Sequence, residues 1–579
     1  MPASAPITEN ALDRGRPAGE PLTASGGPLR RAYRWLLRPP TSLLVLALAL
    51  FAIGHLLGYP GRTSDDPLFN SPHENVRYQL AERWLDTGSP TDPLPAHDLL
   101  PADVAPALTP RDAGLLDGAV VPKDFVYGLA LTTGLRALSP WLPALTSTIS
   151  AVALLVVTGL LGRHALGSRA AGVLAAGLLA STIAFWSAAA GLVETGATTA
   201  ALFLAGVLAL VVRRREVVGS GGASGGLLPD VAAGVCFGLA VGTHYATFLL
   251  VAGTALVFAR RREGGSAVRL AVLVVAAAIT LAPVLAFNAE VYGSALTDGY
   301  SVGVDFLDEN LGENTGGLLS LRPGLLLEHV QRYLLRPEAL AFLALAALGA
   351  WTARRSGGRT AVSALGAAAL VGGIPLLVFA GARPLSGVDT FLVNASLMRY
   401  LAPLAGVLAV LAAAGATELG RRRPVAATVV VLATILLGVG IAVDGPQGPL
   451  DTRDRIPRDR AQRDLALEVI PSEAVVITGR SDKFLWPRRT TLSAPYLVDE
   501  PIEAGDDGHL ARRAPTPARL GEVVIGVVDA GFEVFLWNEG RWFNGRRSGA
   551  FDELDGLLAA EGIERVETEL PGLWRFRTS

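Results

Sequence analysis

The hydrophobic and polar positions of the chain form long apolar runs that alternate with short polar connections. The apolar runs lie near 41–58, 141–162, 168–187, 195–212, 230–259, 268–287, 338–353, 361–380, 398–418 and 424–443. Most of them have about the 20 residues that an α-helix needs to cross roughly 30 Å of hydrocarbon. The pattern therefore predicts a mainly α-helical, polytopic membrane protein.

Clusters of arginine between the runs predict how the chain crosses the membrane. They fall at 30–38, 163–169, 213–215, 260–262, 354–359 and 421–423. Positive residues stay on the cytoplasmic side, so each cluster marks that side. The run 230–259 has a cluster at both ends and therefore needs two short helices with a turn near 242–245. The pattern predicts eleven transmembrane helices, a cytoplasmic N-terminus and an extracytoplasmic segment after Val443.

The composition agrees with this fold class and excludes others. Hydrophobic residues make up 51% of the chain and charged residues 18%, which is too apolar for a soluble globular protein. The single cysteine, Cys236, excludes an internal disulfide and a cysteine-rich metal site. The arginines follow the topology, and no nucleic-acid-binding pattern is present. Residues 1–39 lack apolar periodicity, which predicts a disordered cytoplasmic tail before an uncleaved signal-anchor helix.

A long polar loop, residues 59–124, interrupts the apolar pattern directly after the first helix. It holds nine Asp and two Glu against four Arg and one Lys, a net charge of −6. Val76, Leu80 and Trp84 recur every four residues in it, which predicts a helix. The arginine pattern puts this loop and the loop 288–337 on the extracytoplasmic face. We therefore expect the loop to carry chemistry at the membrane surface.

The last part of the chain, residues 444–579, has the pattern of a small extracytoplasmic α/β domain. A charged linker rich in Pro and Gly, 444–463, is expected to precede it. The expected helices are 460–469, 516–530 and 550–561, and the expected strands are 474–478, 532–537, 563–569 and 573–577. No Gly-rich phosphate loop follows the first strand, and no metal-ligand spacing occurs. We therefore expect a docking or substrate-gripping role for this domain.

Three segments of the membrane region carry motifs. They are SPHENVRYQLAERWLDTGSPT (71–91), NAEVYGSALTDGYS (288–301) and SLMRYLAPLAGVLAV (396–410). They resemble motifs of the C-type membrane glycosyltransferase superfamily (GT-C), in particular of bacterial relatives of protein mannosyltransferases and aminoarabinose transferases. The resemblance covers residues 40–440 and implies a GT-C-like transmembrane core over 40–443.

This resemblance implies a glycosyltransferase of the plasma membrane. Such an enzyme transfers a hexosyl or pentosyl group, with inversion, from a polyprenyl-phosphate donor to a glycan, lipid or protein acceptor of the cell envelope. The alternative is a membrane transporter or lipid flippase. Transporters often have internal repeats and ionisable residues near the bilayer midplane, whereas the centres of these runs are nearly free of charge and no repeat is present.

Sugar transfer with inversion needs a carboxylate that takes the proton of the attacking hydroxyl. Glu74 is one candidate, and Asp65 and Asp66, at the exit of the first helix, are the others. Glu74 also fits a structural role, because the segment 71–74 reads as a helix start with a capping box. The family often has Asp-Glu where this chain has His73-Glu74. The sequence therefore leaves the base open among these three carboxylates.

Further residues are expected to bind the substrates. Arg399 lies at the outer end of its helix, against the positive-inside pattern, which indicates a contact with a phosphate or with lipid headgroups. The resemblance implies that His244, at the turn of the two short helices, lies near the donor phosphate. Glu194, Asp298 and Tyr300 are candidates on the same face. Clustered Asp, Glu and His are compatible with a divalent metal, but no ligand spacing demands one.

Overall fold

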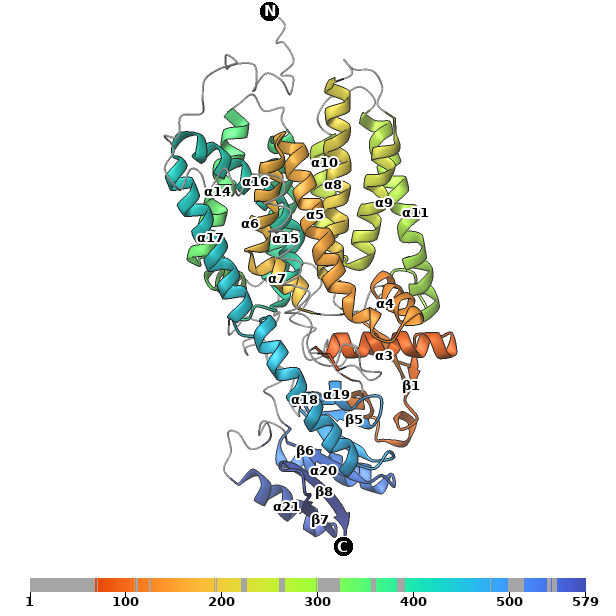
Figure 1. Ribbon diagram of the computed structural model, residues 1–579. Helices are drawn as coiled ribbons and strands as arrows, with labels where there is room; N and C mark the ends of the chain where they lie inside the picture. Colours follow the sequence, from red (N-terminus) through yellow and green to blue (C-terminus); the bar gives the residue numbers. More distant parts are fainter. Residues whose placement is uncertain are drawn as a thin grey trace, which may run out of the picture.

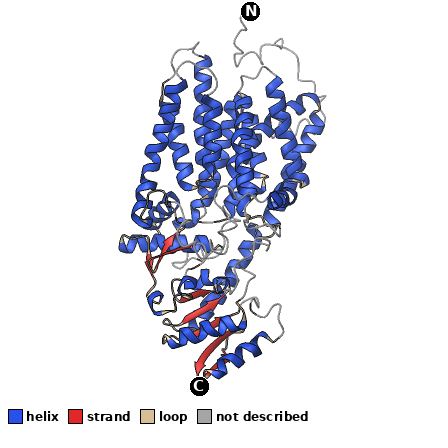
Figure 2. Ribbon diagram, turned by 180° about the vertical axis from the view of Figure 1, so that it is seen from behind, coloured by secondary structure: helices blue, strands red, loops and turns tan. Residues whose placement is uncertain are grey.

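The molecule consists of a bundle of long helices with a smaller α/β region at one end (Figure 1). The computed structural model describes residues 68–69, 71–108, 110, 113–123, 126–191, 193, 195–219, 226–259, 266–297, 299, 323–355, 361–382, 391–479, 481–497, 515–538, 543 and 549–579. Figure 2 shows that the described strands lie at the α/β end and directly beside it. The prediction of a mainly helical membrane protein is confirmed.

Apolar helices build the bundle. They are α5 (Thr146–Leu166), α6 (Arg169–Ala180), α7 (Ile183–Ala190), α8 (Gly196–Gly219), α9 (Leu228–Thr243), α10 (Thr247–Ala259), α11 (Ser266–Tyr292), α13 (Pro323–His329), the π-helix η5 (Val330–Leu334), α14 (Pro337–Arg355), α15 (Ala361–Gly381), α16 (Ser396–Arg422) and α17 (Pro424–Asp444). Among the described residues, six helices are long and apolar enough to cross a membrane, or eight if each of two bent pairs is one span. Helices α9 and α10 are shorter apolar helices.

The two short helices predicted within 230–259 are present. Helix α9 ends at Thr243 and α10 begins at Thr247, so the turn includes His244. An arginine cluster at both ends of one apolar run thus identified a helical hairpin. The total of eleven crossings stays a prediction, because the first run, 41–58, lies outside the described residues.

The run 168–187, which the pattern presents as one helix, is bent. Helices α6 and α7 meet at 72°, at Ser181 and Thr182. The Ser181 hydroxyl donates to the carbonyl of Leu178 (2.7 Å), and Thr182 Oγ1 accepts from the N–H of Phe185 (3.2 Å). Hydroxyl side chains that bond to nearby backbone compete with the helix ladder, which explains the break. A second bend, of 93°, separates η5 from α14.

Helix α16 lies at the centre of the bundle and packs against α5, α6, α7, α8, α14, α15 and α17. Its contact with α14 depends on two glycines. A Cβ atom on Gly349 would lie 2.0 Å from the carbonyl oxygen of Leu411, and one on Gly415 would lie 2.0 Å from that of Leu345. Small residues let helix backbones approach closely within a membrane. The two glycines therefore set the spacing of α14 and α16.

The polar loop that precedes the bundle folds as a helix and a small sheet. Its elements are α3 (Pro72–Thr87), β1 (Asp92–Pro93), η1 (His97–Leu99), η2 (Ala105–Leu108), β2 (Ala113–Leu116) and β3 (Ala119–Pro122), followed by α4 (Val126–Leu138) and η3 (Leu142–Leu145). Helix α3 is the helix predicted from the apolar spacing. The strands pair antiparallel in the order β1-β3-β2. Asp117 and Gly118 join β2 to β3 with positive φ (49° and 73°), as a tight hairpin turn requires.

The C-terminal region forms a five-stranded sheet with helices. Its elements are α18 (Pro449–Val469), β4 (Val475–Thr478), α19 (Asp482–Leu485), β5 (Thr490–Ser493), η6 (Ala494–Tyr496), α20 (Pro517–Asp529), β6 (Val534–Trp537), α21 (Ala550–Ala560), β7 (Ile563–Glu567) and β8 (Leu573–Thr578). The strand order is β5-β4-β6-β8-β7, in which β5, β4 and β6 are parallel and β7 and β8 antiparallel to their neighbours. The predicted linker 444–463 is wrong from Pro449 onward, because α18 covers it; proline is well tolerated at a helix start.

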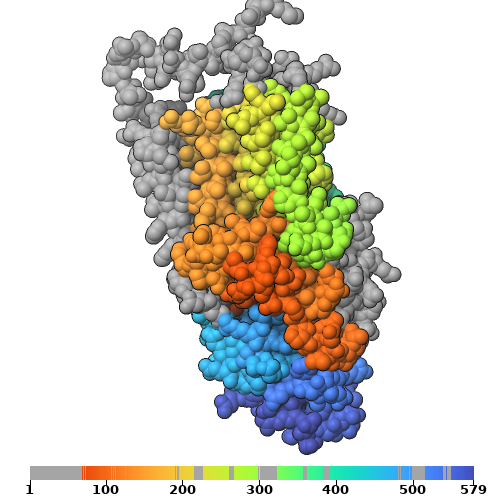
Figure 3. Space-filling view, turned by 90° about the vertical axis from the view of Figure 1, so that its right-hand side faces the viewer, coloured from red at the N-terminus to blue at the C-terminus, as the bar shows by residue number. Residues whose placement is uncertain are grey.

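The sheet and the polar loop share one hydrophobic core. Ala96, Leu100, Val104, Ala107 and Leu108 pack with sheet residues such as Val475, Ile477 and Leu536. Figure 3 shows the loop segment between the bundle and the C-terminal region. Two segments with a common core lie on one side of a bilayer, so an even number of crossings separates them. This parity agrees with the arginine pattern.

An ion pair supports this contact. Arg519 Nη1 on α20 lies 2.6 Å from Asp103 Oδ2 in the loop, and the hydrogen bond lowers the pKa of the Asp103 carboxyl. The stabilisation is present above the ordinary pKa of an aspartate, and it is lost as the pH falls through the lowered value. Because Asp103 is largely exposed, the hydrophobic contacts contribute more to this interface than the ion pair does.

We expect Gly415→Ala to destabilise the bundle, because its Cβ would collide with the Leu345 carbonyl. Overpacking of this kind costs about 1–3 kcal/mol. Thermal unfolding in detergent measures the effect. Gly440→Ala is the control, since nothing lies within 4 Å of its Cβ position. Equal melting temperatures of the two variants would contradict the close approach of α14 and α16.

We expect Leu100→Ala to lower the free energy of unfolding of the C-terminal region by about 2–5 kcal/mol, because it removes a buried side chain from the shared core. The neighbouring Leu99 is 60% exposed, so Leu99→Ala is the matched control. Protease sensitivity of the C-terminal region reports the change. If both variants resist proteolysis like wild type, the loop does not contribute to this core.

Candidate functional site

The N-terminus of α3 is fixed by a capping box. Ser71 Oγ accepts from the N–H of Glu74 (3.1 Å), and Glu74 Oε2 accepts from the N–H of Ser71 (3.3 Å). Phe69, two residues before Ser71, is held as well. Its N–H donates to the side-chain oxygen of Asn75, and its carbonyl accepts from the side-chain NH₂ group of Asn75. The capping interpretation of Glu74 is confirmed. Its role as a base stays a prediction.

Glu74 also reaches a turn far away in the sequence. Its Oε1 accepts from the N–H of Val193 at 3.0 Å. One turn along α3, the Arg77 guanidinium donates to the carbonyl of the same Val193, and its Nη2 lies 2.6 Å from His73 Nε2. Glu74 and Arg77 are 1% and 2% exposed. We call Glu74, Arg77 and the Val193 backbone the Val193 clamp.

The clamped turn, residues 191–195, leads into α8 beside Arg399. A Cβ on Gly128 of α4 would lie 3.0 Å from Thr195 Cγ2 and 3.7 Å from Arg77 Cζ, so the turn is packed against α4. A Cβ on Gly196 would lie 3.7 Å from Arg399 Cβ. The turn therefore lies between the α3–α4 layer and the start of α16.

Arg399 lies on α16, and His244, in the turn between α9 and α10, contacts the next residue of that helix. The half-buried Arg399 donates from Nη2 to Ser396 Oγ (3.0 Å). The ring of the next residue, Tyr400, meets the His244 ring edge-on with centroids 4.3 Å apart. Beside His244, Thr243 Oγ1 lies 2.9 Å from Thr199 Oγ1 of α8. Two predicted site residues thus share one neighbourhood with the clamped turn.

Five predicted site residues lie outside the described residues, namely Asp65, Asp66, Glu194, Asp298 and Tyr300. Residues that flank two of these positions are described. Val193 and Thr195, on either side of Glu194, are buried in the turn. Gly299, between Asp298 and Tyr300, packs so closely on β3 that a Cβ on it would lie 2.1 Å from the Pro122 carbonyl oxygen.

Among the described parts of the chain, no group of three or more His, Cys, Asp or Glu could hold a metal ion. The site described above contains two arginines, the buried Arg77 and the half-buried Arg399. A guanidinium suits a phosphate oxygen through paired N–H donors. The described residues therefore supply charge for an anion and hydrogen-bonding groups around it.

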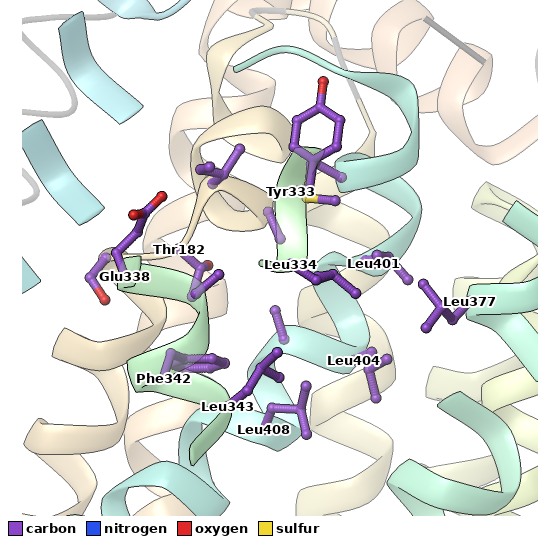
Figure 4. A pocket seen from close by; sticks show the side chains of 16 residues that line it. Thr182, Tyr333, Leu334, Glu338, Phe342, Leu343, Leu377, Leu401, Leu404 and Leu408 are labelled. Atoms are coloured by element: carbon purple, nitrogen blue, oxygen red, sulfur yellow. The ribbon is translucent and has the colours of Figure 1, made fainter. Parts of the chain in front are cut away.

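An apolar cavity of about 160 Å³ lies along α16, and Arg399 is not among its lining residues. It lies where the two bent helix pairs meet α16, and Met398 and Leu401, which flank Arg399 in sequence, line it. Figure 4 shows Phe342, Leu404 and Leu408 deeper among its lining residues, with Glu338 and Thr182 at one side. Arg336, adjacent to the bend, pairs with the buried Glu338 (2.6 Å) and stacks on Phe391.

The sequence reasoning missed Arg77, Tyr400 and the cavity. Arg77 follows Glu74 by three residues on a predicted helix, a spacing that puts both on one face and could have linked them. The cavity depends on two bends. Pro337 marks one of them, because proline disfavours helical geometry in the residue before it.

Comparison with known proteins gives a fold and no close relative. No family model and no curated protein matches the sequence. The crystal structure of ArnT from Cupriavidus metallidurans bound to undecaprenyl phosphate matches with a TM-score of 0.51 and 13% identity, over 94% of this chain and 98% of that chain. Its apo state matches equally. The oligosaccharyltransferase AglB from Archaeoglobus fulgidus, in complex with an inhibitory peptide and a dolichol-phosphate, gives a TM-score of 0.46 and 13% identity, over 93% and 74%.

The match to ArnT, an aminoarabinose transferase, extends over nearly the whole of both chains. At 13% identity it speaks for the fold alone. The architecture of this chain is therefore that of the C-type (GT-C) membrane glycosyltransferases, as the sequence resemblance predicted.

Proposed function

We propose that the protein is an integral membrane glycosyltransferase. It transfers a sugar from a polyprenyl-phosphate donor to a glycan, lipid or protein acceptor of the cell envelope, on the extracytoplasmic face of the plasma membrane. The observation that carries the proposal is helix α16 of a chain with the fold of ArnT: this helix carries Arg399 near its N-terminal end, and its next turns line an apolar cavity. A polyprenyl phosphate has the matching chemistry, because its phosphate is anionic and its chain is hydrocarbon.

Three observations support a polyprenyl-phosphate donor. ArnT, which has the same fold, was crystallised with undecaprenyl phosphate. Arg399 lies near the N-terminal end of α16, and residues of the same helix from Met398 to Leu408 line the apolar cavity. One helix thus offers a cation for a phosphate and apolar surface for isoprenyl units. His244 packs on the neighbouring Tyr400 and adds a polar ring to the same place.

The proposed reaction is a displacement at the anomeric carbon of the donor sugar. A carboxylate accepts the proton of the acceptor hydroxyl, and the oxygen of that hydroxyl forms a bond to the anomeric carbon. The bond between the anomeric carbon and the phosphate oxygen breaks, and the polyprenyl phosphate leaves with both electrons of that bond. Attack from the opposite face inverts the configuration. The Arg399 guanidinium stabilises the negative charge that grows on the leaving phosphate.

Asp65 and Asp66 are the carboxylates that we propose as the base. Both oxygens of Glu74 already accept backbone hydrogen bonds, and its side chain is buried, so it is poorly placed to take a proton from a substrate. The aspartates precede Leu68 and Phe69 by a few residues, and Phe69 is tied to α3 through Asn75. Glu194, Asp298 and Tyr300 complete the proposed substrate-binding set with Arg399 and His244.

Transfer from radiolabelled polyprenyl-phosphate sugars to membrane acceptors tests the proposal. We expect the purified protein to transfer label and Asp65→Asn or Asp66→Asn to lower the rate by about 10²- to 10⁴-fold, because a general base is lost. Asp86→Asn, at an exposed position late in α3, is the control. If neither aspartate matters, the base is elsewhere. If the protein uses no donor but moves lipid from one leaflet to the other in vesicles that contain it, the transporter alternative holds.

Arg399→Gln tests the phosphate contact. We expect the KM for the donor to rise by about 10- to 100-fold, which corresponds to the free energy of a hydrogen bond to a charged group. Arg399→Lys keeps the charge and is expected to fall between wild type and Arg399→Gln. Arg422→Gln, at the other end of α16, removes a cation that pairs with Glu418 and serves as the control. An unchanged KM in Arg399→Gln assigns this arginine to lipid headgroups instead.

A further inference from the structure

The turn between α7 and α8 is irregular backbone, and two buried ions of one helix hold it. Glu74 Oε1 accepts the N–H of Val193, and the Arg77 guanidinium donates to the carbonyl of Val193. The first bond holds the N–H of Val193, and the second holds its carbonyl. Both backbone polar groups of Val193 are thereby fixed.

Burial of the charged side chains of Glu74 and Arg77 costs free energy, and a helix cap can form without such burial. A charged side chain taken out of water needs partners that replace its hydration. The capping box with Ser71 uses one oxygen of Glu74, and an exposed glutamate could form the same bond, so capping alone does not require that Glu74 be buried. Glu74 has partners at Ser71 and at the Val193 N–H, and Arg77 has partners at the Val193 carbonyl and at His73.

The neighbours of the turn connect it to the proposed donor site. Thr195 packs against α4 at Gly128, and Gly196 packs against Ala188 and Arg399. The C-terminal half of α7, which leads into the turn, is attached to the same place, because the Ser187 hydroxyl donates to the carbonyl of Ala395, directly before α16 (2.9 Å). A shift of the turn would therefore change the position of Thr195 and Gly196 relative to Arg399.

We propose that Glu74 and Arg77 are positioning residues, which hold the turn 193–196 in register with Arg399 and so set the geometry of the sugar-transfer site. They act through the Val193 backbone and do not exchange protons with the substrate. Misplacement of a reacting group by about 1 Å can cost about 10²-fold in rate. The kinetic part of this proposal rests on the proposed function, whereas its structural part does not.

A cysteine in the turn tests the structural part without an activity assay. Cys236 is the only cysteine of the chain, so Thr195→Cys in a Cys236→Ser background gives a single buried probe. We expect a water-soluble maleimide to label this cysteine slowly. Glu74→Ala is expected to raise the labelling rate by about tenfold or more. The variant lacks a hydrogen bond from a charged group to the turn, and this loss lowers the free energy of the local opening that exposes the cysteine.

Three further variants distinguish loss of the clamp from general damage to α3 and from loss of a catalytic base. Glu82→Ala removes another acidic side chain of α3, which pairs with Arg136 (2.6 Å) on the side of α4, and it should leave the probe protected. Glu74→Gln keeps an oxygen that can accept from the Val193 N–H but is not basic. We expect it to keep the probe protected and kcat within about fivefold of wild type, while Arg77→Met lowers kcat by about 10²-fold with little change in KM.

The outcomes divide cleanly. An unchanged labelling rate in Glu74→Ala overturns the clamp. A thousandfold loss of kcat in Glu74→Gln, with the probe still protected, overturns the positioning role of Glu74 and makes this residue the base. If the wild-type protein transfers no sugar, the proposed function fails, and the labelling experiment still decides whether the clamp exists. If Glu74→Ala does not fold, Arg77→Lys, which keeps the charge but loses the forked donor, is used for the labelling.

Discussion

The burial of α16 is the constraint on which the rest of the structure depends. Of its most apolar stretch, 72% is buried inside the protein, compared with 11% for α11. Helices on nearly every side hold it, and Gly349 and Gly415 bring α14 within backbone contact. Its N-terminal end carries Arg399 and Tyr400, and the next turns line the apolar cavity. The helix that is most firmly packed is thus also the one that presents the proposed phosphate contact.

Sequence reasoning succeeded where one local rule determined the structure. Membrane-length runs predicted the helices, and the arginine clusters predicted the α9–α10 hairpin, because the cost of moving charge across a bilayer constrains each connection. The Ser71–Glu74 capping box was readable because both its residues lie in one turn. The short segment β5, with two threonines and a single strongly apolar residue, Leu492, carries no such signal and was missed.

The candidate site depends on contacts that the sequence alone does not reveal. Glu74 and Val193 are 119 residues apart, and the bond between them involves a backbone N–H that any residue at 193 would offer. His244 and Arg399 could be proposed one by one from topology and resemblance, but the contact of His244 with Tyr400, the neighbour of Arg399, depends on how the turn between α9 and α10 packs on α16. The bends that open the cavity likewise arise from hydroxyl and proline positions whose effect depends on the neighbouring helices.

The core shared by the polar loop and the C-terminal sheet has a consequence for how the protein is made. Asp103 and Arg519 are separated by 416 residues, and nearly all of the membrane bundle is synthesised between them. Leu100 and Val104 leave the ribosome long before β4 or α20 exists, so the apolar face of the loop has no partner during most of translation. Completion of this face is therefore a late step of biogenesis, and a chain that stops within the bundle carries an uncovered hydrophobic surface that quality-control proteases can recognise.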